Sequence, residues 1–208
     1  MTEDKLREQF VMHGKSLCDR GLSGGSTGNM SVRTGDGFLA SPTNSCLGRL
    51  DPAKLSKLDI EGRHVGGDAP TKEVFLHMAM YRERPQAGAV VHLHSTYSVA
   101  VSCLADIDPG DVLPAITPYY VMRIGKCPLI PYFRPGDAAL GPAVAEKAAA
   151  HPAVLLANHG PVVSGKDLDT AVYTLEELEE TARLFLLLRG MKVRGLTEDQ
   201  AAGLRAHF

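Results

Sequence analysis

The sequence predicts an α/β protein with a mixed or mainly antiparallel sheet flanked by helices. Helical and strand patterns alternate along the 208 residues, which is typical of helices packed on a sheet. A Thr-Gly-Asp-Gly turn at 34–37 joins two apolar runs, 29–33 and 38–41, as in a β-hairpin. Because no repeat, charge block or low-complexity linker divides the chain, residues 1–208 are expected to form a single domain.

The first half of the chain predicts two helices, a glycine-rich loop and a second hairpin. These segments are a helix at 3–20, a loop at 21–28, a hairpin at 58–68 and a helix from Thr71 to about Arg84. The first helix has its apolar residues on one face and two acidic residues in its first turn, where the helix dipole favours them. Thr71 follows a proline and is expected to cap the second helix.

The second half of the chain predicts further alternation of strands and helices. The expected strands are 89–94, 116–124, 128–132 and 153–157, and the expected helices are 96–104, 137–150, 167–189 and a short one after 197–200. Ser95 is expected to cap the helix that follows it, and Thr197 and Gln200 match a capping box. The acidic run at 176–180, which includes Glu179, is expected to form a solvated helix face.

Composition excludes several classes of protein. Lys and Arg total 22 and Asp and Glu total 24, a net charge of −2, so a surface that binds nucleic acid or membranes is not expected. The N-terminus lacks the apolar run of a signal peptide, and no stretch approaches the roughly 20 apolar residues that span a bilayer. The four cysteines form no Cys-x-x-Cys pair and are expected to be free thiols. A cytoplasmic protein is therefore expected.

Two histidines lie two residues apart in the apolar run that contains His92 and His94. Residues two apart on a strand point to the same face of the sheet, so the two imidazoles are expected side by side. Adjacent imidazoles suit zinc or another borderline divalent metal. Two ligands do not complete a site, and the pair fits a polar sheet face equally well.

Two further residues would complete a metal site. His159 precedes Gly160 at the end of a buried strand, where the glycine lets the chain turn sharply; a histidine that only stabilises the turn fits as well. Glu73 stands in the first turn of a predicted helix, where the dipole favours any acidic residue. Its functional interpretation is a carboxylate that ligates the metal or moves protons beside it. His77, four residues further on, is interpreted as a core histidine or one that supports the site.

Three segments have the composition of an anion-binding site. The loop 24–29 supplies backbone N–H groups and two hydroxyls that suit a phosphate. Segment 41–44 adds a hydroxyl and an amide. Thr71 and Lys72 stand at a helix N-terminus, where the dipole attracts anions and the lysine adds a positive charge. Each segment alone is common in loops, and together with the metal ligands they make a more specific pattern.

Together, these motifs resemble the class II aldolase/adducin superfamily over about residues 5–190. That superfamily includes fuculose-phosphate aldolase and ribulose-phosphate 4-epimerase. The resemblance implies a three-layer α/β/α fold around a mainly antiparallel central sheet. It also implies a homotetramer with active sites at subunit boundaries, and one divalent metal per subunit, Zn²⁺ or another such as Mn²⁺ or Co²⁺.

The resemblance also assigns roles to individual positions. His92, His94 and His159 match the metal-binding histidines, and Glu73 matches the acidic residue that transfers protons and can ligate the resting metal. The phosphate-binding positions are Gly28, Asn29, Thr43, Asn44, Thr71 and Lys72.

Lys72 and the tyrosines at 119–120 differ from these positions in what the resemblance implies. Lys72 departs from the aldolase pattern, in which a serine stands at that position, and pairs with either the phosphate or the carboxylate of a substrate. Tyr119 or Tyr120 is implied to reach the site of a neighbouring subunit.

Several further segments are similar to one branch of the superfamily, the 3-oxo-tetronate 4-phosphate decarboxylases. These segments are 41–48, 55–59, 117–122, 132–137 and 155–162. The resemblance implies a lyase of sugar-acid catabolism that converts a small phosphorylated sugar acid into dihydroxyacetone phosphate and carbon dioxide through a metal-stabilised enediolate. In this mechanism Glu73 carries a proton and delivers it to C2.

Two alternatives to this function remain at the level of the sequence. The same metal motif fits an aldolase of the fuculose-phosphate type or a ribulose-phosphate 4-epimerase, because both reactions pass through the same kind of enediolate. A non-catalytic adducin-like module would keep the fold, but it has no need of the complete set formed by Glu73 and the three histidines.

Overall fold

The structure is a computed structural model that describes residues 2–207. Its strands are β1 (Asn29–Arg33), β2 (Phe38–Ala40), β3 (Ser56–Leu58), β4 (His64–Gly66), β5 (Ala89–His92), β6 (Leu129–Ile130), β7 (Ala153–Leu156) and β8 (Gly160–Gly165). Its α-helices are α1 (Glu3–Asp19), α2 (Val74–Glu83), α3 (Thr96–Ser102), α4 (Pro118–Arg123), α5 (Leu140–Ala148), α6 (Leu168–Leu188) and α7 (Glu198–His207). Two short 3-10 helices, η1 (Leu47–Arg49) and η2 (Pro52–Lys54), lie between β2 and β3.

The strands in the described residues form one eight-stranded sheet with the order β4-β3-β2-β1-β5-β8-β7-β6. Neighbouring strands pair antiparallel, except β6 and β7, which are parallel. The sheet is therefore mainly antiparallel, and this prediction is confirmed. β1 and β5 occupy the middle of the sheet, so the segments that leave their ends are surrounded by the rest of the fold.

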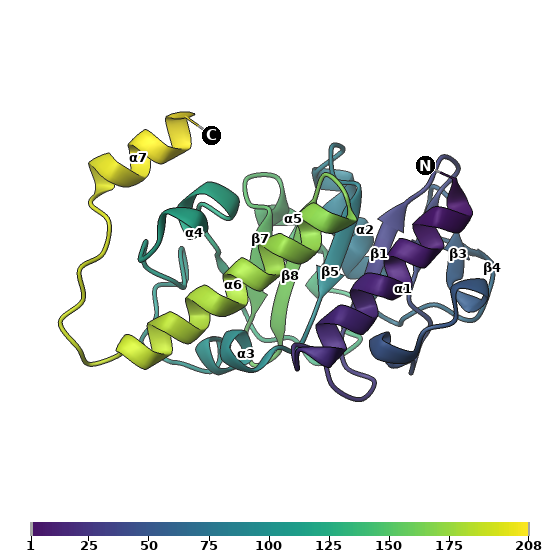
Figure 1. The fold of residues 1–208 in the computed structure, drawn as a ribbon, viewed down its shortest axis with the longest axis horizontal. Coiled ribbons are helices and arrows are strands. Elements are labelled where there is room, and N and C mark those ends of the chain that lie inside the picture. The colour runs from purple at the N-terminus through teal and green to yellow at the C-terminus, as the bar shows by residue number, and fades with distance from the viewer. Residues whose placement is uncertain (1, 208) are drawn as a thin grey trace.

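Helices cover both faces of the sheet. α1 and α6 lie side by side across one face, and α2 and α5 cover the other (Figure 1). An apolar core fills the space between the sheet and each layer of helices: Phe10 and Leu178 belong to the first core, and Leu76 and Val144 to the second. The three-layer α/β/α architecture predicted from the sequence is therefore confirmed.

The pleat of β5 decides where its last residue, His92, points. Val91 packs in the core beneath α1 and α6, whereas Val90 packs in the core beneath α2 and α5. Because successive side chains of a strand point to opposite faces, His92 shares the face of Val90. His92 therefore points toward the layer that contains α2.

One predicted strand is wrong and one strand was missed. Residues 116–124 contain the helix α4 instead of a strand, because the Thr117 hydroxyl accepts a hydrogen bond from the Tyr120 amide and Pro118 takes the first helical position. β8 was not predicted, since its glycines and proline weaken the strand pattern. It is nevertheless paired on both sides, with β5 and with β7.

The remaining predicted elements are present with shifted ends. Both hairpins form, and the Asp167 side chain caps α6. The helix predicted at 137–150 is shorter and runs from Leu140 to Ala148. Thr197 and Gln200 exchange the two hydrogen bonds of a capping box at the start of α7.

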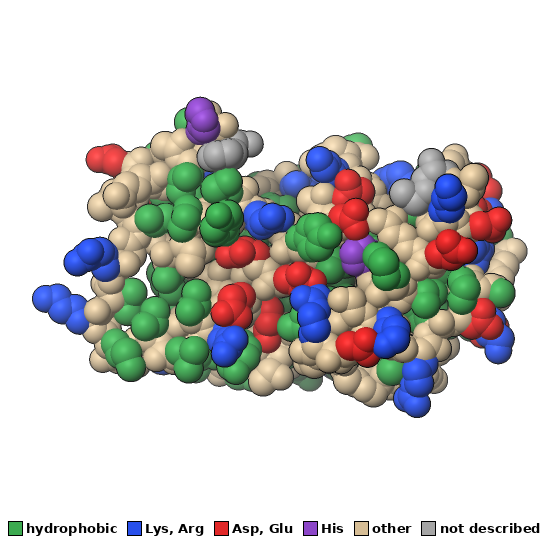
Figure 2. Space-filling view, in the orientation of Figure 1, with side chains coloured by type: hydrophobic (Ala, Val, Ile, Leu, Met, Phe, Trp, Pro, Cys, Tyr) green, Lys and Arg blue, Asp and Glu red, His purple; other side chains and the backbone are tan. Residues whose placement is uncertain are grey.

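The surface view shows two kinds of exterior. Acidic and basic side chains alternate over α1 and α6, while hydrophobic side chains gather near α7 and the segment that leads to it (Figure 2). Exposed apolar residues in this part of the chain include Leu187, Met191 and Val193. Among residues 2–207, no helix has both the length and the apolar character that crossing a membrane requires, and the cysteines are free thiols.

Candidate active site

Glu73, His92, His94 and His159 converge on one point at the end of β5. One ligand atom from each of the four residues lies within 4.8 Å of the others. The Nε2 atom of His92 is 3.1 Å from that of His94 and 3.3 Å from that of His159, and the last two are 3.0 Å apart. The Glu73 carboxylate stands at 3.6 Å from His92 and 3.4 Å from His159.

The sheet brings these histidines together from two distant segments. His92 ends β5, and His94 follows in the extended chain before α3, so the predicted strand 89–94 is two residues too long. His159 lies in the turn between β7 and β8, and β8 pairs directly with β5. Gly160 is required in this turn, since a Cβ atom there would lie 2.3 Å from the Leu93 carbonyl oxygen.

The buried histidine has a fixed tautomer. His92 Nδ1 lies 2.8 Å from the Pro161 carbonyl oxygen, and a carbonyl only accepts, so Nδ1 carries the proton. Its Nε2 lone pair therefore points into the cluster. Burial lowers the pKa of His92 to about 3, and burial also lowers the pKa of His94 and of His159. All three imidazoles are neutral at pH 7, as metal ligands must be.

The spacing of the nitrogens fits a divalent metal. Ligands 2.0–2.1 Å from a tetrahedral zinc are separated by about 3.3–3.4 Å, close to the distances of 3.0–3.3 Å between the three Nε2 atoms. The His92 Nε2 atom has no proton to donate, yet it faces two other nitrogens. Such a convergence of lone pairs suits a cation, which would lie among the three histidines with Glu73 beside it.

Glu73 owes its position to a late start of α2. The helix begins at Val74 and not at Thr71, so the expected Thr71 cap is wrong: Glu73 is the N-cap residue, and its carboxylate makes no capping bond. The Thr71 hydroxyl accepts a hydrogen bond from the Glu73 amide instead. The carboxylate is therefore free to turn toward the histidines.

Opposing effects act on the charge of Glu73. Burial raises the pKa of the carboxyl, while the electrostatic interaction with the adjacent His92 ring and the hydrogen bond from Asn29 Nδ2 to Oε2, 2.7 Å long, lower it. The net shift of the pKa is downward. The resting site thus presents a carboxylate beside three neutral imidazoles.

Behind Glu73 lies a row of buried polar side chains. His77 Nε2 is 2.5 Å from Asn29 Oδ1, and His77 Nδ1 is 2.7 Å from Ser31 Oγ. Ser31 Oγ is also 2.9 Å from the Tyr81 hydroxyl. The spacing of Glu73 and His77 on one helix was the only sequence signal for this arrangement. Ser31 and Tyr81 were missed because single buried hydroxyls have no motif.

The residues expected to bind phosphate lie in neighbouring loops. The Thr43 amide donates to the Ala69 carbonyl, and the Thr71 amide donates to the Ser41 carbonyl, so segments 41–44 and 69–72 run together. Lys72 is exposed, Thr71 is buried, and Asn44 takes a positive φ of 56°. These loops meet the metal cluster through Thr71, which contacts Glu73.

Gly28 and Asn29 lie next to the end of β5. Gly28 has a φ of 75°, and a Cβ atom there would be 2.7 Å from Leu93 Cδ2 and 2.9 Å from the His92 carbonyl oxygen. This close approach explains the glycine. The Asn29 amide group is directed at Glu73 and His77, contacts that the sequence did not indicate, and its phosphate contact stays a prediction. One hydrogen of Nδ2 remains for another acceptor.

A cavity of about 410 Å³ opens beside the cluster. His94 and His159 form one side of it, and the other residues that line it are Val99, Tyr132, Phe133, Pro135 and Asn158. The structure thus adds aromatic side chains from the 132–137 segment that sequence reasoning did not select as site residues. The fold places these side chains at the cavity, and no local sequence motif distinguishes them.

One of the two tyrosines expected to contact a neighbouring subunit lies in the core. Tyr120 is fully buried, and its hydroxyl donates to Asp111, so it belongs to the core and the expectation for this residue is wrong. Tyr119, on the other side of α4, is 59% exposed. Only Tyr119 therefore remains available for such a contact.

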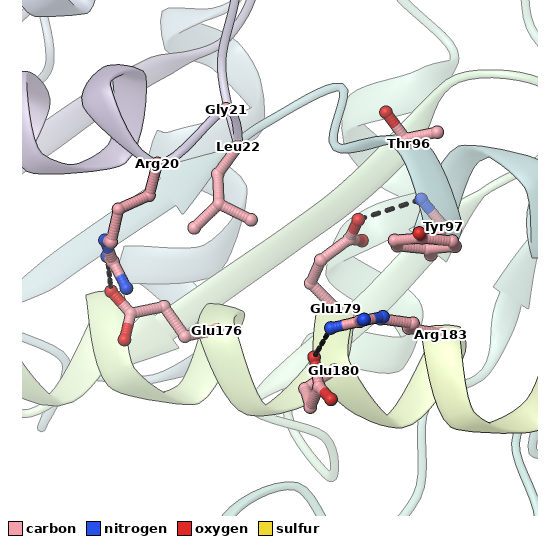
Figure 3. A pocket seen from close by; sticks show the side chains of 9 residues that line it. All are labelled: Arg20, Gly21, Leu22, Thr96, Tyr97, Glu176, Glu179, Glu180 and Arg183. Carbon is pink, nitrogen blue, oxygen red and sulfur yellow. Dashed lines mark hydrogen bonds and ion pairs between the residues drawn. The ribbon is translucent and has the colours of Figure 1, made fainter.

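Glu179 corrects the prediction of a solvated acidic face. It is buried, and its carboxylate accepts hydrogen bonds from the Ser95 hydroxyl, the Tyr97 amide and both the amide and the hydroxyl of Ser98. Figure 3 shows its side chain reaching from α6 to the first turn of α3. Glu179, and not Ser95, caps α3, and it thereby fixes the chain that directly follows His94.

Comparison with known proteins agrees with this geometry. The profile of the family described as Class II Aldolase and Adducin N-terminal domain matches residues 8–186. A 3-oxo-tetronate 4-phosphate decarboxylase from Pectobacterium atrosepticum is 50% identical over 204 residues, which cover 98% of this chain and 94% of that protein. An L-fuculose phosphate aldolase from Methanocaldococcus jannaschii is 34% identical and covers 87% of this chain and 96% of its own length.

Solved structures show the same similarity. The crystal structure of YgbL from Escherichia coli, which is 49% identical, superposes with a TM-score of 0.96 over 98% of this chain and 99% of that chain. A structure of L-fuculose 1-phosphate aldolase superposes with a TM-score of 0.85 at 25% identity, over 97% of this chain and 95% of that one. By sequence, by fold and by extent of the match, this chain belongs to the class II aldolase and adducin family.

Proposed function

We propose that the protein catalyses the metal-dependent decarboxylation of 3-oxo-tetronate 4-phosphate to dihydroxyacetone phosphate and carbon dioxide. The observation that carries this proposal is the complete cluster of Glu73, His92, His94 and His159. It occurs in a chain that is 50% identical, over almost its whole length, to a protein named as that decarboxylase. We also propose that residues 1–208 act as one class II aldolase-type domain.

The chemistry of the substrate defines what the site must do. The C3 ketone is β to the carboxylate, so loss of carbon dioxide leaves an enediolate across C2 and C3. Each turnover then takes up one proton at C2. A divalent metal held by the three histidines would supply a Lewis acid that stabilises the developing negative charge.

Glu73 is the proposed source of that proton. Asn29 occupies Oε2 by donating to it, so Oε1 is the oxygen left to carry a proton. Oε1 is also the oxygen closer to His159, on the side of the cluster where the cavity opens. Glu73 takes up one proton per turnover from the buffered solvent and delivers it to C2, acting as a general acid and returning to the carboxylate.

The neighbouring loops are the proposed phosphate site. It consists of Gly28, Asn29, Thr43, Asn44, Thr71 and Lys72. Binding of the remote phosphate would align the bond between C2 and the carboxylate with the metal and Glu73, so that phosphate-binding energy contributes to orientation of the substrate. The exposed ammonium of Lys72 adds a positive charge where this anionic substrate enters, and it pairs with phosphate or carboxylate.

Further properties follow from the same proposal. Zn²⁺ suits three imidazoles and a carboxylate, with Mn²⁺ or Co²⁺ as substitutes, one ion per subunit. A cytoplasmic homotetramer acting in sugar-acid catabolism is proposed, supported by the exposed apolar residues near α7. In that assembly Tyr119 is the candidate for a contact with a neighbouring subunit's site.

The test is a coupled assay on freshly generated 3-oxo-tetronate 4-phosphate. Dihydroxyacetone phosphate and carbon dioxide are followed together, with metal-loaded protein and with chelator-treated protein. Equal amounts of both products, lost on chelation and restored by metal, would establish the proposal. Metal-dependent cleavage of L-fuculose 1-phosphate to an aldehyde, or epimerisation of ribulose 5-phosphate, without carbon dioxide release would replace it by the aldolase or epimerase function.

A further inference from the structure

A chain of buried hydrogen bonds runs from Glu73 into the core beneath α2. Its members in order are Glu73, Asn29, His77, Ser31 and Tyr81, joined by contacts of 2.7, 2.5, 2.7 and 2.9 Å. Apart from Glu73, every member is at most 5% exposed. Four polar side chains in an apolar layer are costly to bury unless each is paired, and here each of them has a partner.

The donors in this series of hydrogen bonds all point toward Glu73. The ionised Glu73 carboxylate only accepts, so Asn29 must present its NH₂ group to Glu73 and its carbonyl oxygen to His77. That oxygen also only accepts, so the proton of His77 must sit on Nε2. Burial lowers the pKa of His77 to about 4, so the ring is neutral and its Nδ1 accepts from Ser31. Ser31 in turn accepts from the Tyr81 hydroxyl.

This series of hydrogen bonds orients the Asn29 amide and does not conduct protons. The Asn29 amide interrupts any proton path, because its nitrogen does not pass protons on. An amide can rotate by 180°, which would turn Oδ1 toward the Glu73 carboxylate and place two acceptors against each other. The His77 Nε2–H group prevents this rotation, since a rotated Asn29 would face it with a second donor.

We propose that His77 is a positioning residue for Glu73 that acts through Asn29. By fixing the amide, His77 keeps Oε2 of Glu73 hydrogen-bonded and reserves Oε1 for proton transfer. The inference rests on the proposed function, in which Glu73 is the proton donor, and it assigns a role to a histidine that contacts neither metal nor substrate.

The first test reads the tautomer directly. Long-range ¹H–¹⁵N NMR spectra of protein with ¹⁵N-labelled histidine identify which ring nitrogen of His77 carries the proton. We expect the proton on Nε2 in the unmodified protein at pH 7. A proton on Nδ1, or on both nitrogens, would overturn the proposal. This readout depends on no reaction.

The second test measures proton transfer in three variants. His77→Leu removes the donor to Asn29, whereas His77→Gln retains an N–H group near the position of Nε2. His13→Gln is the matched control, because His13 is also buried but pairs with Asp169 on the opposite side of the sheet. The rate is read as deuterium exchange from D₂O into the hydroxymethyl group of dihydroxyacetone phosphate, and as kcat for carbon dioxide release.

His77→Leu should slow both rates about 10–100-fold, the usual effect of removing a group that orients an active-site residue. KM should change less than kcat, because the other five residues of the proposed phosphate site are left in place. His77→Gln and His13→Gln should stay within about threefold of the unmodified protein.

Several results would refute the role of His77. An unchanged rate of deuterium exchange in His77→Leu would refute it. A folded His77→Gln variant that is as slow as His77→Leu would also refute it, because the slow rate would then follow from altered packing and not from loss of the N–H donor. If the unmodified protein exchanges deuterium but releases no carbon dioxide, the decarboxylase proposal fails while the role of His77 is still decided by exchange. If the unmodified protein shows neither deuterium exchange nor carbon dioxide release, the tautomer of His77 in the NMR spectrum decides whether His77 orients Asn29.

Discussion

The Nε2 atoms of His94 and His159 lie 3.0 Å apart although 65 residues separate them in the chain. The pairing of β8 with both β5 and β7 produces this contact, because it places the β7–β8 turn against the end of β5. Gly160 permits the approach by packing on the Leu93 carbonyl. The convergence of the three histidines therefore follows from the strand pairing of the sheet.

Replacing His94 by alanine should remove metal and activity together. His94 contributes one of three converging nitrogens, and two imidazoles with a carboxylate make a weaker site. We expect the bound metal to fall from one ion per chain to well below half after gel filtration. Elemental analysis and the coupled assay measure both quantities on the same sample.

The control for this variant is His64→Ala. His64 is exposed on β4, and its Nε2 atom lies against the Gly66 and Gly67 carbonyl oxygens of the same hairpin, so its loss should leave the metal content unchanged. If His94→Ala kept a full complement of metal and full activity, His94 would not be a ligand.

Replacing Glu73 by glutamine should preserve the fold and reduce turnover. Glutamine has the same shape, and its oxygen can still accept from Asn29, but its amide cannot carry a proton to C2. Loss of a general acid lowers kcat by about 10²–10⁴-fold. The matched control is Glu83→Gln at the far end of α2, where the side chain is exposed. An undiminished rate in Glu73→Gln would exclude the proton-transfer role.

The metal cluster was predictable because each of its parts has a local pattern. His92 and His94 lie two apart at the end of an apolar run, and His159 precedes a glycine at another strand end. Motifs of this kind depend on the pleat of a strand and on turn chemistry, which are read from neighbouring residues. The hairpins and the long helix α6 were predictable for the same reason.

The features that sequence did not predict depend on contacts between distant segments. Glu179 is surrounded by three other acidic residues in the sequence, yet it is buried because the open N-terminus of α3 lies above it. Ser31 and Tyr81 acquire meaning only because β1 and α2 pack together. Tyr120 was assigned to a subunit contact by the family resemblance alone, whereas in the helix that starts after Thr117 its side chain is buried.

The stability of the metal-free protein should depend on His77 in acid. Burial lowers the pKa of His77 from 6.5 to about 4, so between these pH values the unfolded chain binds a proton that the folded chain does not. The stabilisation is complete above pH 6.5 and is lost as the pH falls toward 4. A shift of this size corresponds to roughly 3 kcal/mol.

Urea unfolding of the chelated protein at pH 7 and pH 4 measures this effect. The loss of unfolding free energy on acidification should be smaller in His77→Gln than in the unmodified protein, by up to roughly 3 kcal/mol. His13→Gln serves as the comparison. An equal loss in His77→Gln and the unmodified protein would show that His77 keeps an ordinary pKa in the fold.

Replacing Glu179 by alanine should destabilise the protein more than replacing its neighbour Glu180. Alanine at 179 leaves the buried amide of Ser98 and the partly buried amide of Tyr97 without their acceptor, which costs about 2–4 kcal/mol in unfolding free energy. Glu180 is exposed and pairs only with Arg183 (Figure 3), a kind of pair worth about 0–1 kcal/mol. Urea denaturation separates the two, and equal losses would contradict the capping role.

Gly28→Ala should disturb the active site beyond the usual cost of replacing a glycine. Gly28 and Gly21 have nearly the same positive φ, 75° and 76°, so alanine strains the backbone equally at both. Only at Gly28 does the new methyl group collide, with Leu93 Cδ2 at 2.7 Å and the His92 carbonyl at 2.9 Å, whereas nothing lies within 4 Å at Gly21. We expect Gly21→Ala to cost about 1 kcal/mol and Gly28→Ala about 2–4 kcal/mol. Because the collision pushes on the backbone of His92, a proposed metal ligand, metal affinity should fall in Gly28→Ala alone. Equal metal affinities in the two variants would mean that the end of β5 relaxes without moving His92.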